Sequence, residues 1–312
     1  MTEAASDEAT AGPGLPIASA AYLNSFKNFT AHASSTGLRT AQLRYAMAAG
    51  ELSNPALEFL LNSRYRRGDR EFEISVQSYF DDAALTMVSQ VGRRMRKSGE
   101  TFALPTPLPL PMALHEVIAR RRSNRTLSGE PLKLTALATI LQCAAGITAT
   151  ATTELKDGTP CSMPLRAAPS GGGLYPIDLH LAVRDIPGLA PGLYDFLPLQ
   201  DALARIETDA AGDDAVRGVM AALPGDFVDI RRASAFLVFS VSPWRSMRKY
   251  GQRGLRFALM ETGYIAENVH LASTAIGCAS CDYGGFYDDE LNRAFGFDGH
   301  YQTAIHAMVL GG

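Results

Sequence analysis

The pattern of apolar and polar positions predicts a helical first third of the chain, followed by a mixture of strands and helices. Between residues 17 and 98, apolar residues recur at three- and four-residue spacing, which is typical of amphipathic helices. Residues 103–113 carry four prolines and predict an extended linker. We therefore expect four parts: a disordered lead at 1–16, a helical region at 17–102, the linker at 103–113 and a domain at 114–312.

The last of these parts alternates between strand-like and helix-like patterns. Short apolar or alternating runs predict strands, and longer runs with helical spacing predict helices. The polar segment 148–166 has no period and predicts a loop or lid. Strands and helices do not follow a strict βαβ order, so the pattern favours an α+β fold. The expected strands lie at 178–186, 192–198, 202–207, 235–241 and 301–311, and the expected helices at 112–122, 134–147, 210–222, 257–277 and 288–296.

One connection in this pattern is unusually basic. The segment "WRSMRKYGQRGLRF", residues 244–257, places five Arg and Lys residues between a buried strand and the longest helix. We expect a loop or the start of a helix here. A solvated connection would explain the charges, and a functional site would explain them equally well.

Composition and charge argue against several classes of function. The net charge of −3 gives no indication of a nucleic-acid or anionic-membrane partner. No apolar run approaches the roughly 18 residues that span a bilayer, and "MTEAASDEATAGPG" lacks the features of a signal peptide. We therefore expect a cytoplasmic protein. Cys278 and Cys281 form a single CxxC without the second ligand pair of a zinc site, so we expect no metal and small buried thiols rather than a redox pair.

Three segments indicate a binding site. In "ARRRSNRTLSG", 119–129, guanidinium groups and a hydroxyl match the oxygens of a phosphate, and Arg121 and Arg125 would share a face on a helix. A solvated helix C-terminus would also explain these cations. In "APSGGGLYP", 168–176, three glycines let a ligand approach the backbone, although a wide turn would use them too. The segment "DYGGF", 282–286, is a similar loop of small residues.

Together these segments resemble the nitroreductase superfamily of flavoproteins, and more specifically its SagB-type branch, the azoline dehydrogenases of thiazole/oxazole-modified peptide biosynthesis. "RRSNRTLSGEPL" resembles the family opening "RRSxRxF…P", and "PSGGGLYP" resembles the branch motif "PSAGALYP". "PGLYDFLP" is similar to "PGLYxYxP", and residues 256–277 are similar to the long helix motif of the branch. The order and spacing agree across residues 112–312. A weaker match at "NSRYRRGDREFEISVQSYF" suggests that the helical region belongs to the branch as well.

The resemblance implies a nitroreductase-like α+β fold, with a central mixed or antiparallel sheet flanked by helices. It also implies a homodimer with two FMN sites at the subunit interface. The chain departs from many nitroreductases in ending "AMVLGG" without a basic pair, so phosphate binding would depend more on 121–125. The residues implied to hold FMN are Arg121, Arg122, Ser123 and Arg125; Pro169, Ser170 and Gly171, which would reach the flavin from the partner subunit; and Tyr283, Gly284 and Gly285 near the reactive face of the ring.

SagB-type enzymes resemble this chain in carrying an adjacent Lys-Tyr pair before the long helix, here Lys249 and Tyr250. In that branch the pair serves as the base machinery of azoline oxidation, in which a proton leaves one ring carbon and a hydride leaves the next. A phenolate at Tyr250 is a plausible base. Bringing its pKa from near 10 to about 7 takes roughly 4 kcal/mol, and a Lys249 ammonium would act in that direction. We expect Tyr250→Phe to abolish turnover and to leave FMN bound.

The expected function is therefore FMN-dependent oxidation of thiazoline or oxazoline rings in a ribosomally synthesised precursor peptide, beside a cyclodehydratase. Two alternatives stay open. An NAD(P)H-dependent nitro- or quinone reductase would need neither Lys249 nor Tyr250. A flavin-bearing scaffold would hold the modifying enzymes together without catalysing the oxidation.

Overall fold

The computed structural model describes residues 59–60, 62–65, 67, 70–80, 82, 84 and 98–312, apart from 156 and 211. The chain divides into two compact units, Met1–Arg64 and Tyr65–Gly312. In the first unit, the described residues form a helical turn in which the Ser63 amide donates to the Phe59 carbonyl at 3.0 Å. The lead expected at 1–16 and the helices expected between 17 and 58 lie outside the described residues.

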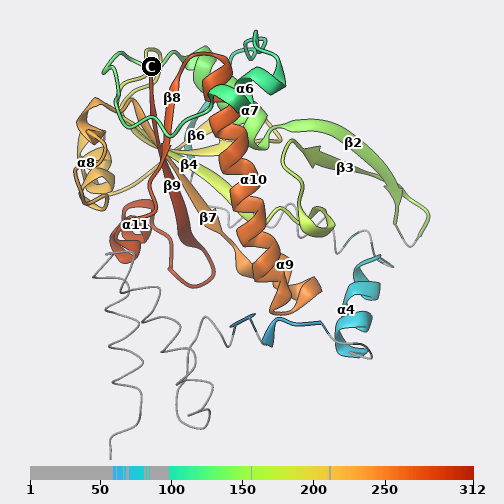
Figure 1. Ribbon diagram of the computed structural model, residues 1–312. Helices are drawn as coiled ribbons and strands as arrows, with labels where there is room; N and C mark the ends of the chain where they lie inside the picture. The colour runs from blue at the N-terminus through green and yellow to red at the C-terminus, as the bar shows by residue number, and fades with distance from the viewer. Residues whose placement is uncertain are drawn as a thin grey trace, which may run out of the picture. The chain divides into compact units, whose positions relative to one another are not determined.

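A seven-stranded antiparallel sheet forms the centre of the second unit (Figure 1). The strand order is β1-β6-β5-β4-β7-β9-β8, and every neighbouring pair runs antiparallel. The α+β prediction is confirmed, and of the two sheet types expected the antiparallel one is found. The strands are β1 (Ser98–Ala103), β4 (Ile177–Val183), β5 (Gly192–Leu197), β6 (Ala202–Ile206), β7 (Ala235–Val241), β8 (Ala279–Asp282) and β9 (Thr303–Gly311).

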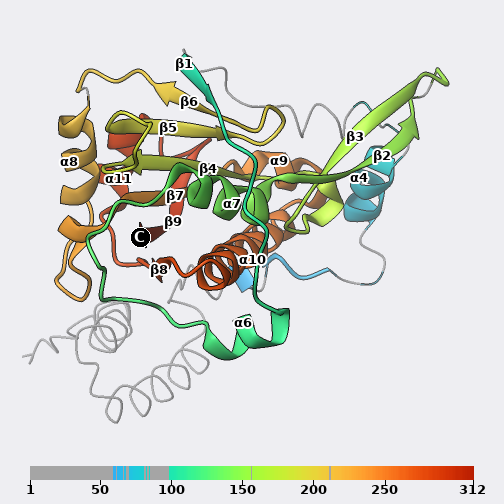
Figure 2. The ribbon, with the colours of Figure 1, turned by 90° about the horizontal axis from the view of Figure 1, so that it is seen from above.

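Helices cover both faces of this sheet (Figure 2). Leu179 and Leu181 of β4 pack into one core with α7 and α10, whereas Ala182 joins a second core with α8 and α11. Because successive strand residues point to opposite faces, coverage on both sides explains why every residue of β4 and β7 is buried. The covering helices are α7 (Leu134–Ala145), α8 (Asp213–Ala221), α10 (Arg253–Ala275) and α11 (Asp288–Phe295), with a short 3-10 turn η2 (Ile230–Arg232).

Two sequence predictions outside this core are wrong. The segment 148–166, expected to be a loop or lid, is an antiparallel hairpin of β2 (Ile147–Glu154) and β3 (Pro160–Arg166). Its mostly exposed polar residues hide the strand pattern, since no face of it is buried in the core. Residues 98–102, expected to be helical, belong to β1, because pairing with β6 extends the sheet edge there. The following residues 104–111 carry no helix or strand, and the segments on both sides of them belong to the one unit Tyr65–Gly312.

The basic segment forms a helix rather than a loop. Helix α9 (Pro243–Tyr250) begins with proline at its first turn, a position that needs no amide donor, and buries Arg245, Ser246 and Lys249 on one side. It turns sharply into α10 at Gly254, where a Cβ atom would lie 2.6 Å from the Ser246 backbone. The remaining elements near the site are α4 (Arg70–Phe80), α6 (Leu114–Arg120) and the 3-10 turn η1 (Gly171–Gly173).

No helix among the described residues combines the length and apolar character needed to cross a membrane.

Candidate active site

The Lys-Tyr pair and the triple-glycine turn meet at one point. A Cβ atom placed on Gly172 would lie 2.5 Å from Tyr250 Oη and 3.0 Å from Lys249 Nζ. Gly172 has a φ of 67°, which side-chain-bearing residues rarely adopt. Both predicted catalytic side chains therefore converge on a backbone that has no side chain to separate them. Gly172 and Lys249 are 77 positions apart, and no pattern in the sequence predicts that they are in contact.

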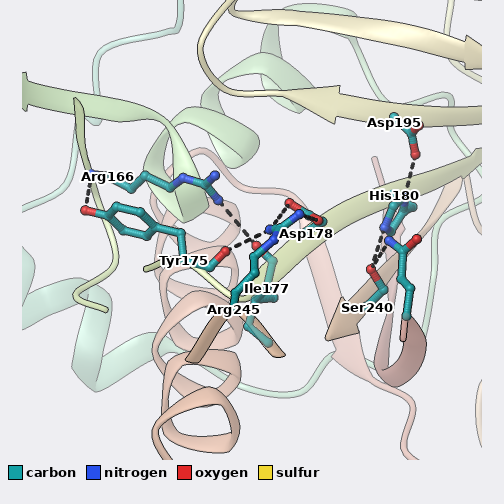
Figure 3. A network of polar contacts seen from close by, with 9 residues as sticks. Arg166, Tyr175, Ile177, Asp178, His180, Asp195, Ser240 and Arg245 are labelled. Atoms are coloured by element: carbon teal, nitrogen blue, oxygen red, sulfur yellow. Dashed lines mark hydrogen bonds and ion pairs between the residues drawn. The ribbon is translucent and has the colours of Figure 1, made fainter. Parts of the chain in front are cut away.

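A buried ion pair fixes α9 in this position (Figure 3). The Arg245 guanidinium donates to both oxygens of Asp178, at 3.1 and 2.8 Å, and also to the Tyr175 carbonyl at 3.0 Å. Both partners are about 4% exposed. Arg245 lies one helical turn before Lys249, so the pair ties α9 to β4 and to the end of the glycine turn. Sequence reasoning missed this role, because Arg245 looked like one more cation of a solvated segment.

Burial governs the charge of the catalytic pair. Lys249 is 2% exposed, and burial lowers its pKa. Burial raises the pKa of Tyr250, whose ring stands edge-on to Phe257 with centroids 4.9 Å apart. The expectation of a phenolate at Tyr250 is therefore wrong for this structure, because loss of water disfavours the charged form of both groups. Burial makes the neutral amine of Lys249 easier to reach, and a neutral amine is a stronger base than a neutral phenol.

Gly172 offers a direct probe of this convergence. We expect Gly172→Ala to lower turnover by about tenfold to a hundredfold, because the methyl group would displace the Tyr250 hydroxyl and the Lys249 amine. Gly188→Ala is the matched control, since Gly188 also has a positive φ of 93° but its Cβ would meet only Leu134 Cδ2 at 3.7 Å. Steady-state kinetics of the two variants checks this. Equal losses in both would assign the effect to backbone strain.

A buried carboxylate, Glu261, lies beneath the same turn. It is on α10 and 2% exposed, and its nearby hydrogen-bonding groups, Ser170 and the Ile177 backbone, do not reach the geometry of a full hydrogen bond. Burial raises its pKa to about 7, although Ser170 and Arg166 act in the opposite direction. Sequence reasoning missed Glu261 as well, since a single acid within a helical pattern carries no signal of burial.

The arginine segment is extended rather than helical. Helix α6 ends at Arg120, so the expectation that Arg121 and Arg125 share a helical face is wrong. The segment packs instead along β8 and the later part of α10: the Asn124 amide donates to the Ser280 carbonyl at 2.9 Å, and Arg121 Nε lies 3.8 Å from Glu267 Oε1. Arg122 donates to the carbonyls of Ala119 and Arg121. Ser123 is half-buried and Arg125 is exposed.

The glycine segment after β8 lies beside the arginine segment, because both contact β8. Gly284 and Gly285 are exposed, and a Cβ on either would meet no atom within 4 Å. The side chain of Tyr283 is buried, and its hydroxyl donates to the Pro224 carbonyl at 2.6 Å. A flavin contact at this position would therefore come from the backbone of Tyr283, not from its side chain.

One chain does not bring all the predicted flavin residues together. The turn formed by Pro169, Ser170 and Gly171 meets the start of α10, where a Cβ on Gly171 would lie 3.1 Å from Phe257. Arg121 meets the same helix at Glu267, ten residues later. At 1.5 Å per residue the two points are about 15 Å apart along the axis. Two groups result: 121–125 with 283–285, and 169–172 with the Lys-Tyr pair.

A second polar chain in Figure 3 has the order of a serine–histidine–aspartate triad. Ser240 Oγ lies 2.8 Å from His180 Nε2, and His180 Nδ1 lies 2.5 Å from Asp195 Oδ1. Ser240 is fully buried, and the rings of Phe295 and Phe297 pack on His180. No substrate can reach this serine. These polar contacts therefore link the strands β4, β5 and β7 and do not form a catalytic site.

The cysteines behave as small apolar groups. Burial raises the pKa values of the Cys278 and Cys281 thiols, which disfavours the reactive thiolate. In the residues that the structure describes, no group of three or more His, Cys, Asp or Glu side chains is arranged to hold a metal ion.

Comparisons with known proteins concern the family and the fold of this chain. Residues 118–312 match the model of the Nitroreductase family. A protein of Methanocaldococcus jannaschii named as a nitroreductase is 32% identical over 195 residues, which are 62% of this chain and 90% of that protein. The microcin B17-processing protein McbC of Escherichia coli is 30% identical over 137 residues, which are 43% of this chain and 49% of McbC.

Solved structures share the fold. A nitroreductase structure from Anabaena variabilis has a TM-score of 0.59 at 21% identity, covering 82% of this chain and 45% of that one. A chain of the E. coli microcin synthetase McbBCD complex, with truncated pro-MccB17 bound, has a TM-score of 0.52 at 20% identity, covering 85% and 98%.

Proposed function

Because this chain belongs to the nitroreductase family, we propose that it is an FMN-dependent azoline dehydrogenase, which oxidises thiazoline or oxazoline rings of a ribosomally synthesised peptide. The convergence of Lys249 and Tyr250 on Gly172 carries this proposal, because a plain flavin reductase has no need of a buried amine and phenol at one point. The similarity to McbC, a protein that processes microcin B17, supports a peptide substrate. The SagB-type motifs support the same branch.

The residues present fit the cofactor that members of this family typically bind. Arg122 and Arg125 are exposed cations, and Arg121 and Ser123 are half-exposed beside them, which suits the phosphate and ribityl oxygens of FMN. Gly284 and Gly285 leave the backbone open for close approach. Pro169, Ser170 and Gly171 are the further residues that would hold it. When bound, FMN supplies the acceptor for a hydride.

The pair on α9 would handle the proton of the same reaction. The proton on the azoline Cα lies beside an imine-like C=N and a carbonyl, so it is acidic for a C–H group. Burial lowers the pKa of Lys249, and the amine in its neutral form would accept that proton. Tyr250, with its raised pKa, keeps its hydroxyl proton and can donate a hydrogen bond to the oxygen or nitrogen on which negative charge develops.

A homodimer would unite the two groups of flavin residues that one chain keeps apart. Exposed apolar side chains cluster where such an interface would form: Leu114 and Ile118 on α6, and Leu259, Met260 and Tyr264 on α10. Helices α6 and α10 are in contact, so these residues form one patch. Burial of the patch against a second copy would place 121–125 of one subunit near 169–171 of its partner.

The other partners follow from the substrate. Azoline rings arise by cyclodehydration of cysteine, serine or threonine residues in a peptide. We therefore expect an azoline-containing precursor peptide and the cyclodehydratase that produces it. The McbBCD structure, with truncated pro-MccB17 bound, supports this kind of assembly.

The cofactor is tested first. We expect the purified protein to show a flavin absorption spectrum and to release, on heating, a compound with the mass of FMN. A variant with both Arg121→Ala and Arg125→Ala is expected to lose most of this colour, and Arg217→Ala on the distant α8 is the control. A wild-type protein that stays colourless after soaking in excess FMN would contradict the proposal.

The reaction is tested next with a synthetic azoline peptide, FMN and oxygen. We expect conversion to the azole, with a loss of two mass units per ring. Rapid flavin reduction by NAD(P)H with no azole product would favour the nitro- or quinone-reductase alternative. In the complete set of modifying enzymes, azole formation that needs the protein but neither Lys249 nor Tyr250 would favour the scaffold.

A further inference from the structure

A helix outside the family-matched residues packs on the Lys-Tyr pair. Helix α4 precedes residues 118–312, yet it contacts the end of α9. The Ser75 hydroxyl lies 2.9 Å from the Lys249 carbonyl and 3.1 Å from the Arg248 carbonyl, and it donates to them. The last carbonyls of a helix have no partner within the helix, so Ser75 caps α9 at the catalytic pair.

Two aromatic rings of α4 face the two catalytic side chains. Lys249 Nζ lies 5.5 Å from the centroid of the Tyr79 ring, within the range of a cation–π interaction. Tyr79 is 8% exposed, so little water competes for the contact. The Phe72 ring lies 6.3 Å from that of Tyr250. Phe72, Ser75 and Tyr79 are spaced three and four residues apart, so one face of α4 makes all these contacts.

We propose that Tyr79 is a positioning residue of the proton-transfer site, whose ring holds the Lys249 amine against the triple-glycine turn. Helix α4 thereby completes an active site that residues 118–312 leave unfinished. The inference rests on the proposed role of Lys249, and it assigns the region before the family domain a part in the chemistry.

The proposal can be tested through the pKa of Lys249. Tyr79 on α4, Tyr250 on α9 itself and the backbone of η1 surround the amine, and Arg253 begins α10 nearby. Burial lowers the pKa of Lys249. The face of an aromatic ring favours the ammonium form and so opposes this effect. Removing the ring while keeping the burial would lower the pKa further.

The experiment compares wild type with Tyr79→Leu and Tyr79→Phe by NMR of protein labelled with [ε-¹³C]lysine. The chain has only five lysines, and Lys249→Met identifies the signal of Lys249 by its loss. We expect Tyr79→Leu to move the Lys249 titration down by about half a pH unit or more. We expect Tyr79→Phe, which keeps the ring and loses only the hydroxyl, to titrate as wild type. The same shift is expected in the pH profile of kcat.

A Lys249 titration and a kcat profile unchanged in Tyr79→Leu would overturn the proposal. If Tyr79→Leu does not fold, Tyr79→Met removes the ring while filling a similar volume and is judged by the same two readouts. The titration needs no turnover, so it tests Tyr79 even if the wild type fails to oxidise azolines. That failure would overturn the proposed function and leave the positioning of Lys249 by Tyr79 to stand or fall on its own measurement.

Discussion

Lys249→Met is expected to reduce azoline oxidation by about 10³-fold, because it removes the amine that lies at Gly172 and would accept the proton. Methionine fills the buried site of the lysine stem without the amine. Tyr250→Phe is expected to lose about 10²-fold, since it removes a hydrogen-bond donor and leaves the ring packed on Phe257. Both variants should keep the FMN content of wild type. Single-turnover conversion of an azoline peptide, followed by mass spectrometry, measures these losses.

Matched controls separate chemistry from folding in this test. Lys133→Met removes an exposed lysine before α7, and Tyr301→Phe removes an exposed hydroxyl before β9; both should oxidise the peptide at the wild-type rate. Wild-type turnover in Lys249→Met would exclude the amine as the base. A Tyr250→Phe variant far more impaired than Lys249→Met would return the role of base to the phenol.

Glu261→Gln is expected to raise the free energy of unfolding above that of wild type at pH values above neutral. This gain should be roughly 3 kcal/mol larger than the difference between the two proteins at acidic pH. The pKa of Glu261 rises from 4.5 to about 7 on folding. The folded state therefore binds a proton that the unfolded chain has lost, and stability falls as the pH rises from about 4.5 to about 7. Above pH 7 the folded wild type holds an ionised carboxylate in a buried site, and its free energy of unfolding stays lowered by the full amount. Glutamine does not ionise, so the variant does not lose this stability. Urea unfolding of both proteins at pH 4.5 and pH 8.5 checks the difference.

Glu267→Gln is the control for this measurement. Glu267 lies on the same helix, but its side chain is 52% exposed, so its replacement should give no comparable gain between the two pH values. Equal behaviour of the two variants would show that Glu261 ionises as freely as a surface carboxylate. Such a result would contradict the assignment of a buried carboxyl with a raised pKa beneath the glycine turn.

Much of the fold could be predicted from periodicity. The strands β4, β5, β6, β7 and β9 and the helices α7, α8, α10 and α11 lie where the pattern placed them, and the hairpin of β5 and β6 is confirmed. The failures have a common cause. The β2–β3 hairpin and β1 lack a strongly apolar face, and α9 has its apolar positions masked by arginines, so the period of each element was hidden.

The site could be predicted in part. The adjacent Lys249 and Tyr250 and the glycine segment were found as local motifs. Their meeting, the clamp of Arg245 on Asp178 and the buried Glu261 were not, because each depends on contacts between residues far apart in the chain. The pKa of Tyr250 was predicted in the wrong direction for the same reason, because the burial that raises it depends on packing between distant residues.

The sequence by itself determined the α+β class, the central strands and helices, and the residue types from which the site is built. These are local properties, because the hydrophobic periodicity of a helix or strand and the residue types of a motif depend only on neighbouring residues in the sequence. Only the tertiary structure decided which motifs meet, which side chains lose their water, and that α4 packs on the catalytic pair. Burial and proximity are properties of the packed chain, and they set the pKa of Lys249 and the neighbours that hold it.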